Sequence, residues 1–325
     1  MFTMRFDMRA PSTGASTREL YTAAVDMAEW GDQHGCAALL VSEHHASSDG
    51  YLPSPFLLAS AMAARTREVP IQIAATLVPL HDPVSLAEQM VVLDILSGGR
   101  ASFVCAVGYR PEEYAMFGHS YKGRGRRMEE CLRVIQQAFA GEPFEYEGRQ
   151  VHVTPPPLTP GGPPLLMGGA SPVVVKRAAR FGMGVLLQAD DPTLEPLYLA
   201  ACEEAGTTPG IFTGPTEDPV GSGFVSEDPD RTWSEIGPHL LHDARMYAAW
   251  MGDAGALSKS SALDVDSLRA ENGAYRVFTP DEAVVYIRKN GALMTQPLSG
   301  GLPPKYGWET LELLASKVLP ALKQS

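Results

Sequence analysis

The stretch AALLVSEHHASSDGY, residues 37–51, decides the fold of this chain. It begins with a short apolar run, and such a run bounded by polar residues is typical of a strand buried on both faces of a parallel sheet. The run ends at Glu43, His44 and His45. Parallel α/β folds keep their active sites at the carboxyl ends of their strands. We therefore expect this acid and these two imidazoles to carry the chemistry.

Strand and helix patterns alternate on both sides of this stretch. Further strands are predicted at residues 5–9, 71–77, 101–107, 165–168, 185–188, 223–226 and 292–298. Helices are predicted between them, with clear end signals such as Asp82-Pro83 before one helix and Ser97-Gly98-Gly99 after it. About eight strands alternating with helices favour a (β/α)8 TIM barrel over a doubly wound sheet, which usually needs fewer strands.

The domain prediction is one barrel over residues 1–325, with insertions at its C-terminal face. The irregular stretch at about 252–277 is interpreted as a variable insertion, and the Pro- and Gly-rich stretch after residue 142 as a hairpin followed by a surface excursion.

Composition and charge narrow the class of partner. The net charge of −12 and the pI near 5.1 argue against nucleic acid or an anionic membrane as partner and favour a small-molecule substrate. The four cysteines show no C-x-x-C spacing, which is typical of a reduced cytosolic protein. The N-terminus lacks a signal-peptide pattern, and no stretch of about 18 apolar residues occurs. A cytoplasmic protein that does not span a membrane is expected.

Glu43, His44 and His45 are the first candidates for catalysis. Neighbouring residues on a strand point to opposite sides, so the two histidines are not expected to ligate one metal together. A histidine at a strand end suits proton transfer near neutral pH, and Glu43 is predicted to fix its tautomer. Hydrogen-bonded packing histidines are an equally good interpretation of these residues alone.

Two other strand ends favour ligand binding. Ala74, Ala75 and Thr76 end one strand with small side chains, against which a flat ligand could lie, although small residues also serve core packing. Gly168, Gly169, Ala170 and Ser171 precede Pro172 at a predicted helix start, where free N–H groups favour an anion such as phosphate. An ordinary capped turn is the alternative. No metal site is predicted, because the other strand ends offer too few carboxylates and imidazoles.

Five segments together resemble the luciferase-like monooxygenase family: SEHHASSDGYLPSP, AATLVPLHDPVSLAEQMVVLDILSGGR, GYRPEEYAMFG, RGRRMEECL and PPLLMGGASP. The resemblance covers most of residues 5–184. It implies a (β/α)8 barrel that holds reduced FMN, or the deazaflavin coenzyme F420, at its C-terminal mouth.

The resemblance also implies residue roles. His44 matches the family's catalytic histidine, with His45 beside it. Ala74-Ala75 matches a non-prolyl cis peptide beneath the flavin ring, and Gly169, Ala170 and Ser171 match the phosphate loop. Many FMN-binding relatives carry an Arg just before the position of Gly108, where this chain has Val107, and Arg110 is the candidate substitute.

The resulting hypothesis is a flavin-dependent monooxygenase that uses reduced FMN and O₂ on an organic substrate, with a separate flavin reductase as donor and a homodimer as assembly. Three rivals stay open. They are F420-dependent hydride transfer without oxygen, a non-enzymatic flavin-binding protein, and a metal-dependent barrel hydrolase.

Overall fold

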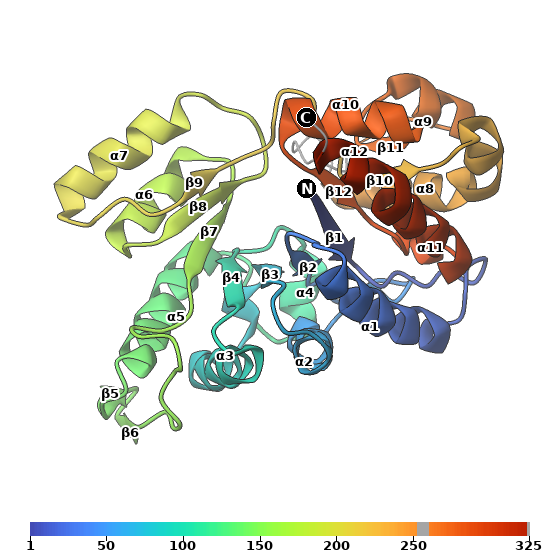
Figure 1. Cartoon of the computed structure of the whole chain (residues 1–325). Helices are drawn as coiled ribbons and strands as arrows, with labels where there is room; N and C mark the ends of the chain where they lie inside the picture. Colours follow the sequence, from blue (N-terminus) through green and yellow to red (C-terminus); the bar gives the residue numbers. More distant parts are fainter. Residues whose placement is uncertain (252–259, 324–325) are drawn as a thin grey trace. The chain divides into compact units, whose positions relative to one another are not determined.

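The computed structural model describes residues 1–251 and 260–323. The chain divides into two compact units (Figure 1). Unit 1 comprises Met1–Leu40, Ser47–Pro53 and Pro215–Ser325, and unit 2 comprises Val41–Ala46 and Ser54–Gly214. The strand β2 (Leu39–Val41), which precedes Glu43, lies where the chain passes from the first unit to the second.

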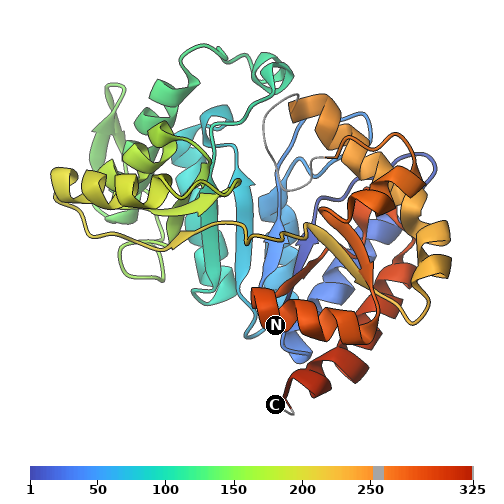
Figure 2. The ribbon, with the colours of Figure 1, turned by 90° about the horizontal axis from the view of Figure 1, so that it is seen from above.

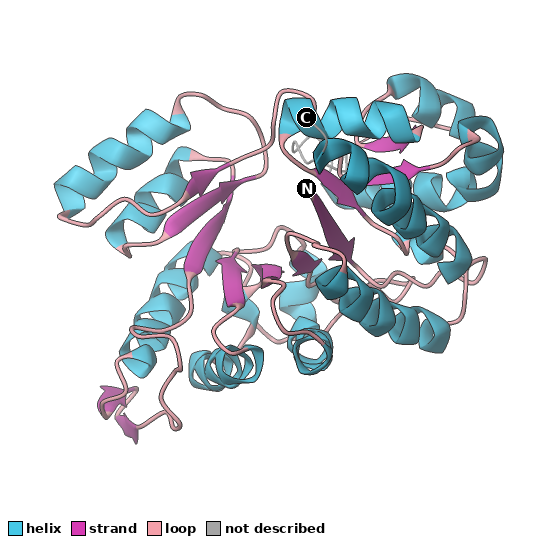
Figure 3. Cartoon of the chain, in the orientation of Figure 1, coloured by secondary structure: helices cyan, strands magenta, loops and turns pink. Residues whose placement is uncertain are grey.

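Unit 2 is built on a parallel sheet whose strands alternate with helices (Figure 3). The strands follow the order β3 (Ile71–Thr76), β4 (Ala101–Cys105), β7 (Leu165–Gly169), β8 (Gly184–Leu187) and β9 (Phe212–Thr213). The helices are α2 (Pro55–Arg65), α3 (Pro83–Ser97), α4 (Pro111–Met116), α5 (Arg124–Phe139), α6 (Pro172–Arg180) and α7 (Leu194–Ala205), with a 3₁₀ turn η1 at Val78–Leu80. Apolar side chains of the strands are buried, as a sheet covered by helices requires.

Local sequence signals explain these helices. The Asp82 carboxylate accepts hydrogen bonds from the N–H groups of Val84 and Ser85, and Gly98 ends α3 in a left-handed conformation with φ of 67°. Both predicted ends of α3 are therefore confirmed. The apolar stripe of α5 is also buried, from Met128 to Phe139.

The predicted hairpin is confirmed as β5 (Phe144–Tyr146) paired antiparallel with β6 (Arg149–Val151). The excursion that follows it is attached to α3 by Asp94. The Asp94 carboxylate accepts hydrogen bonds from the backbone N–H of Thr159 at 2.8 Å and from its hydroxyl at 2.6 Å.

Unit 1 contains the two ends of the described chain. The strand β1 (Phe2–Phe6) pairs in parallel with β12 (Leu293–Thr295), and β10 (Ser222–Val225) pairs in parallel with β11 (Tyr275–Phe278). Its helical segments are α1 (Thr17–Gln33), α8 (Pro229–Met251), α9 (Val265–Glu271), α10 (Pro280–Asn290), η2 (Ser299–Gly301), α11 (Pro304–Leu313), the π-helical η3 (Leu314–Val318) and α12 (Leu319–Lys323). In Figure 2 the C-terminal segments are orange to red and α1 is dark blue; α1 packs against α11.

Several predicted boundaries were wrong. The first strand ends at Phe6 instead of Arg9, because Met8 has a left-handed φ of 61° that an extended strand excludes. The last predicted strand, 292–298, is shorter than expected, because β12 covers only Leu293–Thr295. The two-residue strand β9 is too short to produce a periodic signal and was missed.

The last third of the chain departs furthest from the prediction. The segment 223–226 is extended, but it pairs with β11 in a separate two-stranded sheet and not with a barrel strand. Of the stretch 252–277, residues 252–259 lie outside the described residues. The remainder is regular instead of irregular, because Asp264 and Ser267 form a capping box that starts α9.

The α/β class with parallel strands is confirmed. Within residues 1–251 and 260–323, no helix combines the length and the apolar character needed to cross a membrane.

Candidate active site

The end of β2 places Glu43, His44 and His45 in a buried position. Their exposed fractions are 2%, 7% and 6%. His44 points to one side of the chain, as strand alternation predicts. Glu43 and His45 lie on the opposite side, where they bond to each other. The two histidines therefore belong to two separate hydrogen-bonded groups.

Glu43 is the centre of the first group. Its Oε1 accepts hydrogen bonds from the Nε2 atoms of His45 at 2.9 Å and His81 at 2.8 Å, and its Oε2 accepts the Leu77 N–H at 2.7 Å. Burial on its own would raise the pKa of this carboxyl group. The hydrogen bonds from His45, His81 and Leu77 outweigh burial and lower the pKa to about 2, so Glu43 is ionised at neutral pH.

His44 belongs to the second group. Its Nδ1 lies 2.8 Å from Glu113 Oε1, and its Nε2 lies 3.1 Å from the Tyr109 hydroxyl. Glu43 was predicted to fix the tautomer of a histidine at this strand end. It bonds to His45, whereas Glu113 of α4 takes that place for His44. With Nδ1 donating to Glu113, Nε2 is the acceptor atom of the His44 ring.

Glu113 also forms hydrogen bonds that fix the backbone next to His44. Its Oε1 accepts the His45 N–H at 2.9 Å and lies 3.4 Å from Arg110 Nη1. Its Oε2 is buried and has no hydrogen-bond partner among the described residues. Sequence reasoning missed Glu113, although Arg110-Pro111-Glu112-Glu113 has the Pro and acidic residues typical of a first helical turn.

Arg110 was predicted to bind cofactor phosphate. Its guanidinium donates to the carbonyl of His45 at 2.5 Å and to that of Ala46 at 3.4 Å. These bonds secure the loop that follows β2.

Small residues occupy the end of β3. The Ala74–Ala75 peptide bond is cis, as the family resemblance implied, and both alanines are half-buried. Thr76 is fully buried, and its hydroxyl oxygen has no hydrogen-bond partner within the described part of the chain. Thr76 is in register with Cys105 at the end of β4, and Gly108 follows with φ of 71°.

The segment from Gly168 to Ser171 joins β7 to α6. A Cβ atom on Gly168 would lie 2.8 Å from Val104 Cγ1, and Gly169 has φ of 142°, so larger residues fit poorly at both positions. Ser171 is the N-cap of α6, but its side chain makes no capping hydrogen bond. Its hydroxyl and the N–H groups at the helix start thus remain suited to an anion.

Parallel pairing brings these strand ends together within unit 2. Because β3, β4 and β7 are neighbours that run in the same direction, their carboxyl ends lie at one edge of the sheet. That edge carries Ala74–Thr76, Gly108 and Gly168–Ser171. The hydrogen bond from Leu77 to Glu43 joins the end of β3 to the histidine loop.

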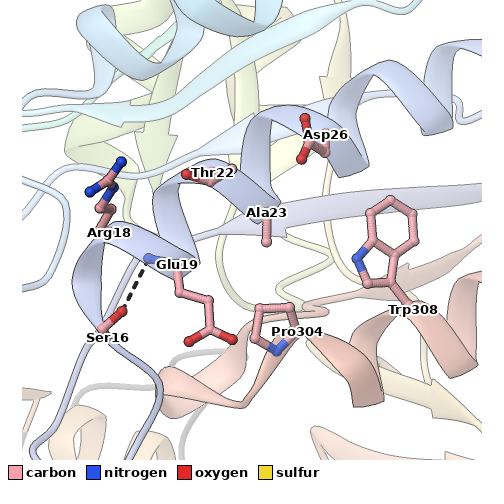
Figure 4. A pocket seen from close by; sticks show the side chains of 8 residues that line it. All are labelled: Ser16, Arg18, Glu19, Thr22, Ala23, Asp26, Pro304 and Trp308. Carbon is pink, nitrogen blue, oxygen red and sulfur yellow. Dashed lines mark hydrogen bonds between the residues drawn. The ribbon is translucent and has the colours of Figure 1, made fainter.

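No group of three or more His, Cys, Asp or Glu residues in the described ranges is arranged to hold a metal ion. A surface cavity of about 400 Å³ lies in unit 1 beside α1 and α11 (Figure 4). Its lining comprises Ser16, Arg18, Glu19, Thr22, Ala23, Asp26, Pro304 and Trp308, none of which is a predicted site residue.

Comparison with known proteins decides the family. The family model described as luciferase-like monooxygenase matches residues 3–272. The chain belongs to the luciferase-like monooxygenase family.

Curated members of this family resemble the chain over part or most of its length. The chain is 29% identical to limonene 1,2-monooxygenase of Rhodococcus erythropolis over 292 residues, which cover 85% of this chain and 72% of that protein. It is 26% identical to the oxygenase component of flavin-dependent trigonelline monooxygenase of Acinetobacter baylyi over 216 residues, which cover 62% and 60%. It spans about half, 46%, of the length of 4-hydroxyprotoasukamycin monooxygenase of Streptomyces nodosus.

Several solved structures share the fold of the chain. Monooxygenase RslO1 of Streptomyces bottropensis has a TM-score of 0.79 at 24% identity, with 99% of each chain covered. The oxygenating constituent of 3,6-diketocamphane monooxygenase of Pseudomonas putida, in complex with FMN, has a TM-score of 0.73 at 19% identity, with 98% of each covered. An F420-dependent secondary alcohol dehydrogenase has a TM-score of 0.66 at 16% identity, with 99% of each covered.

Proposed function

We propose that this member of the luciferase-like family is a flavin-dependent monooxygenase that uses reduced FMN and O₂ to oxygenate a small organic substrate. The observation that carries the proposal is the edge of the unit 2 sheet. There, small residues, a glycine-lined helix start and a hydrogen-bonded histidine follow neighbouring strands.

The residues at this edge fit FMN. The half-buried Ala74 and Ala75 leave room for a flat ring, and the Thr76 hydroxyl, which has no hydrogen-bond partner among the described residues, offers it a hydrogen bond. The phosphate would bind at Gly168–Ser171, where the Ser171 hydroxyl makes no capping bond. Strand β7 lies two strand spacings from β3, about 10 Å, which separates a ring site from a phosphate site.

His44 is assigned the acid/base role. Reduced FMN, when bound, supplies the electrons that activate O₂. Glu113 holds His44 with its proton on Nδ1, so Nε2 is the ring atom that accepts a proton and returns it, once the Tyr109 hydroxyl gives way. Glu43 and His45 form the other hydrogen-bonded group, and their proposed role is to order the loop around His44.

The assembly is proposed to follow the family resemblance. A separate reductase would supply the reduced flavin, as the words "oxygenase component" in the name of the trigonelline relative suggest. We further propose that the strands form a closed (β/α)8 barrel in a single domain with its insertion near 252–277, and that the protein is cytoplasmic.

A homodimer is proposed on the evidence of an exposed apolar face in unit 2. Helices α2 and α3 pack together and expose Leu57, Val92, Ile95 and Leu96, by 75%, 46%, 39% and 51%. An exposed apolar face of this kind is typical of an interface, and a second copy presenting the same face would bury it.

F420-dependent hydride transfer is the second candidate, and one observation favours it. Val107 stands where many FMN-binding relatives have an Arg, and the Arg110 guanidinium bonds to backbone carbonyls of the histidine loop. An FMN phosphate would thus be held by backbone N–H groups and the Ser171 hydroxyl, without an arginine from this loop. A non-enzymatic flavin-binding protein is the third candidate.

An anaerobic titration distinguishes these candidates. The purified protein is titrated with reduced FMN and, separately, with reduced F420, and oxygen is then admitted in the presence of an aldehyde, a cyclic ketone or a cyclic alkene. The proposal predicts binding of reduced FMN and an oxygenated product. Binding of F420 alone would replace it with hydride transfer, and FMN binding without turnover of any donor would leave a flavin-binding protein.

A further inference from the structure

The side chain of Tyr109 covers the acceptor atom of His44 within unit 2. Its hydroxyl lies 3.1 Å from His44 Nε2, and the two rings meet edge to face, with centroids 5.3 Å apart and planes at 65°. Tyr109 is half-buried, whereas His44 is buried. The ring atom that is assigned the proton transfer therefore binds a phenol that belongs to the chain itself.

The direction of this hydrogen bond follows from Glu113. Glu113 Oε1 accepts the His45 N–H at 2.9 Å and lies 3.4 Å from Arg110 Nη1, so it is an acceptor oxygen. His44 Nδ1, at 2.8 Å from the same oxygen, therefore carries a proton and donates it. The lone pair of the neutral His44 ring is then on Nε2, and the Tyr109 hydroxyl donates to it. A ligand that takes the place of this hydroxyl needs a donor group of its own.

The backbone around Tyr109 is held independently of its side chain. The Tyr109 carbonyl accepts the Tyr121 hydroxyl at 3.2 Å, and the Val107 carbonyl accepts the Tyr114 hydroxyl. Rotation of the Tyr109 side chain between rotamers leaves both of these bonds in place. The phenol can therefore leave His44 while the loop keeps its shape.

The surroundings of this loop suit an aromatic ring. Tyr114 and Tyr121 meet edge to face, with ring centroids 5.4 Å apart. Tyr114 is buried in an apolar cluster with Leu77 and Leu80, and Tyr121 packs against that cluster. Edge-to-face pairs of this kind favour aromatic over aliphatic partners. A ligand with an aromatic ring thus finds the same type of contact that Tyr109 makes with His44.

We propose that the Tyr109 phenol holds the place of the substrate's own hydroxyl group, and that the substrate is a phenol whose O–H donates to His44 Nε2 when Tyr109 turns away. A phenol presents the same donor and the same ring, so it replaces both contacts. A ligand without a donor would leave the lost hydrogen bond uncompensated. The chemistry of this inference rests on the proposed function, whereas the preference for a phenol is a property of binding alone.

The proposed reaction then has a defined course on a phenol. His44 takes the phenolic proton at Nε2, which makes the ring more electron-rich and directs oxygen to the carbon beside the hydroxyl. One atom of O₂ is inserted into the C–H bond at that carbon. The other atom leaves as water, formed with two electrons from reduced FMN and two protons. The product is a catechol, to which His44 returns the proton.

The test compares para-cresol with para-methylanisole, which has the same ring but no O–H group. Binding of each ligand is measured by calorimetry, to the protein loaded with oxidised FMN and to the protein without flavin. Para-cresol should bind about tenfold more tightly, because only its hydroxyl replaces the bond to His44. Tyr109→Phe keeps the ring and removes the competing hydroxyl. This variant should gain about tenfold in affinity for para-cresol and should bind para-methylanisole as before.

Two further variants control the result. His44→Phe removes the acceptor atom and should abolish the preference for para-cresol. Tyr146→Phe makes the same exchange in the hairpin strand β5 and should change neither affinity. Equal gains for both ligands in Tyr109→Phe would show that Tyr109 only fills space, and would overturn the inference. Equal affinities of the unaltered protein for the two ligands, or no binding of para-cresol, would overturn it as well.

Turnover separates this inference from the proposed function. With reduced FMN and labelled O₂, para-cresol should give the corresponding catechol with one labelled oxygen atom. Preferential binding of para-cresol without any oxygenated product would leave the phenol preference standing and remove the proposed function. Oxygenation of an aldehyde or a ketone by a protein that shows no preference for para-cresol would remove the inference and leave the proposed function.

Discussion

Asp7 is a buried carboxyl group whose neighbours determine its charge. It lies beyond the end of β1, accepts a hydrogen bond from Gln296 Nε2 at 2.5 Å, and is 3.6 Å from Arg9 Nε. Burial raises its pKa, and the nearby Asp243 carboxylate raises it further. The positive charge of Arg9 opposes both effects, and the resulting pKa is about 7.

This pKa predicts how stability depends on pH. The folded state favours neutral Asp7 more strongly than the unfolded state does, so its contribution is complete below a pH of about 4 and is lost as the pH rises towards 7. Asp7→Asn keeps the acceptor oxygen and cannot ionise. We expect this variant to lose less stability than the unaltered protein between pH 4 and pH 8, as measured by urea unfolding. Parallel stability curves for the two proteins would contradict the assignment.

At the residue scale, the sequence was enough to locate the candidate catalytic histidines but not to identify their hydrogen-bond partners. The buried run before Glu43 located both histidines, because a strand end is recognisable from its neighbours alone. Glu113, the partner of His44, lies 69 residues from it, and His81, a partner of Glu43, lies 38 residues from that carboxylate. No spacing within the sequence determines such long-range contacts, so the partner of His44 could be found only from the fold.

At the scale of single elements, two N-cap residues in similar sequences differ in their hydrogen bonds. Asp82-Pro83 and Ser171-Pro172 each place a capping residue before a proline. The Asp82 side chain accepts two backbone hydrogen bonds, whereas the Ser171 side chain accepts none. The first is a structural cap, whereas the hydroxyl of the second is proposed to bind a ligand.

This difference predicts opposite effects of two alanine substitutions. Asp82→Ala should lower the free energy of unfolding by about 1 kcal/mol and leave affinity for reduced FMN unchanged. Ser171→Ala should leave stability within about 0.5 kcal/mol and weaken binding of reduced FMN several-fold. Urea unfolding and an anaerobic titration measure the two quantities. Equal destabilisation by both substitutions would show that Ser171 is an ordinary cap.

Helices with clear capping residues were predicted well. Strands that are defined by pairing with a distant segment were not. Asp82 and Gly98 marked helix ends correctly because capping is a local interaction. The pairing of β10 with β11 depends on which extended segments meet in space. Their sequences, SGFV and YRVF, are compatible with several partners.

At the scale of the whole molecule, the exposed face of α2 and α3 predicts the oligomeric state. Light scattering should give twice the chain mass of 34.9 kDa, and Leu57→Glu combined with Leu96→Glu should give the mass of a single chain, because burying a glutamate at a symmetric interface is costly. Leu263→Glu is the matched control, since Leu263 is 79% exposed in unit 1. A monomer before any substitution would refute the proposed homodimer.

The central claim is that His44, oriented by Glu113, performs acid/base chemistry beside a bound flavin, and one measurement tests it most directly. Anaerobic binding of reduced FMN and oxygen-dependent turnover are measured together for the unaltered protein, His44→Ala and Glu113→Gln. We predict that both variants bind reduced FMN as the unaltered protein does. His44→Ala should lose about a hundredfold or more in turnover, and Glu113→Gln should lose part of it. Full turnover in His44→Ala would remove His44 from the mechanism and contradict the account.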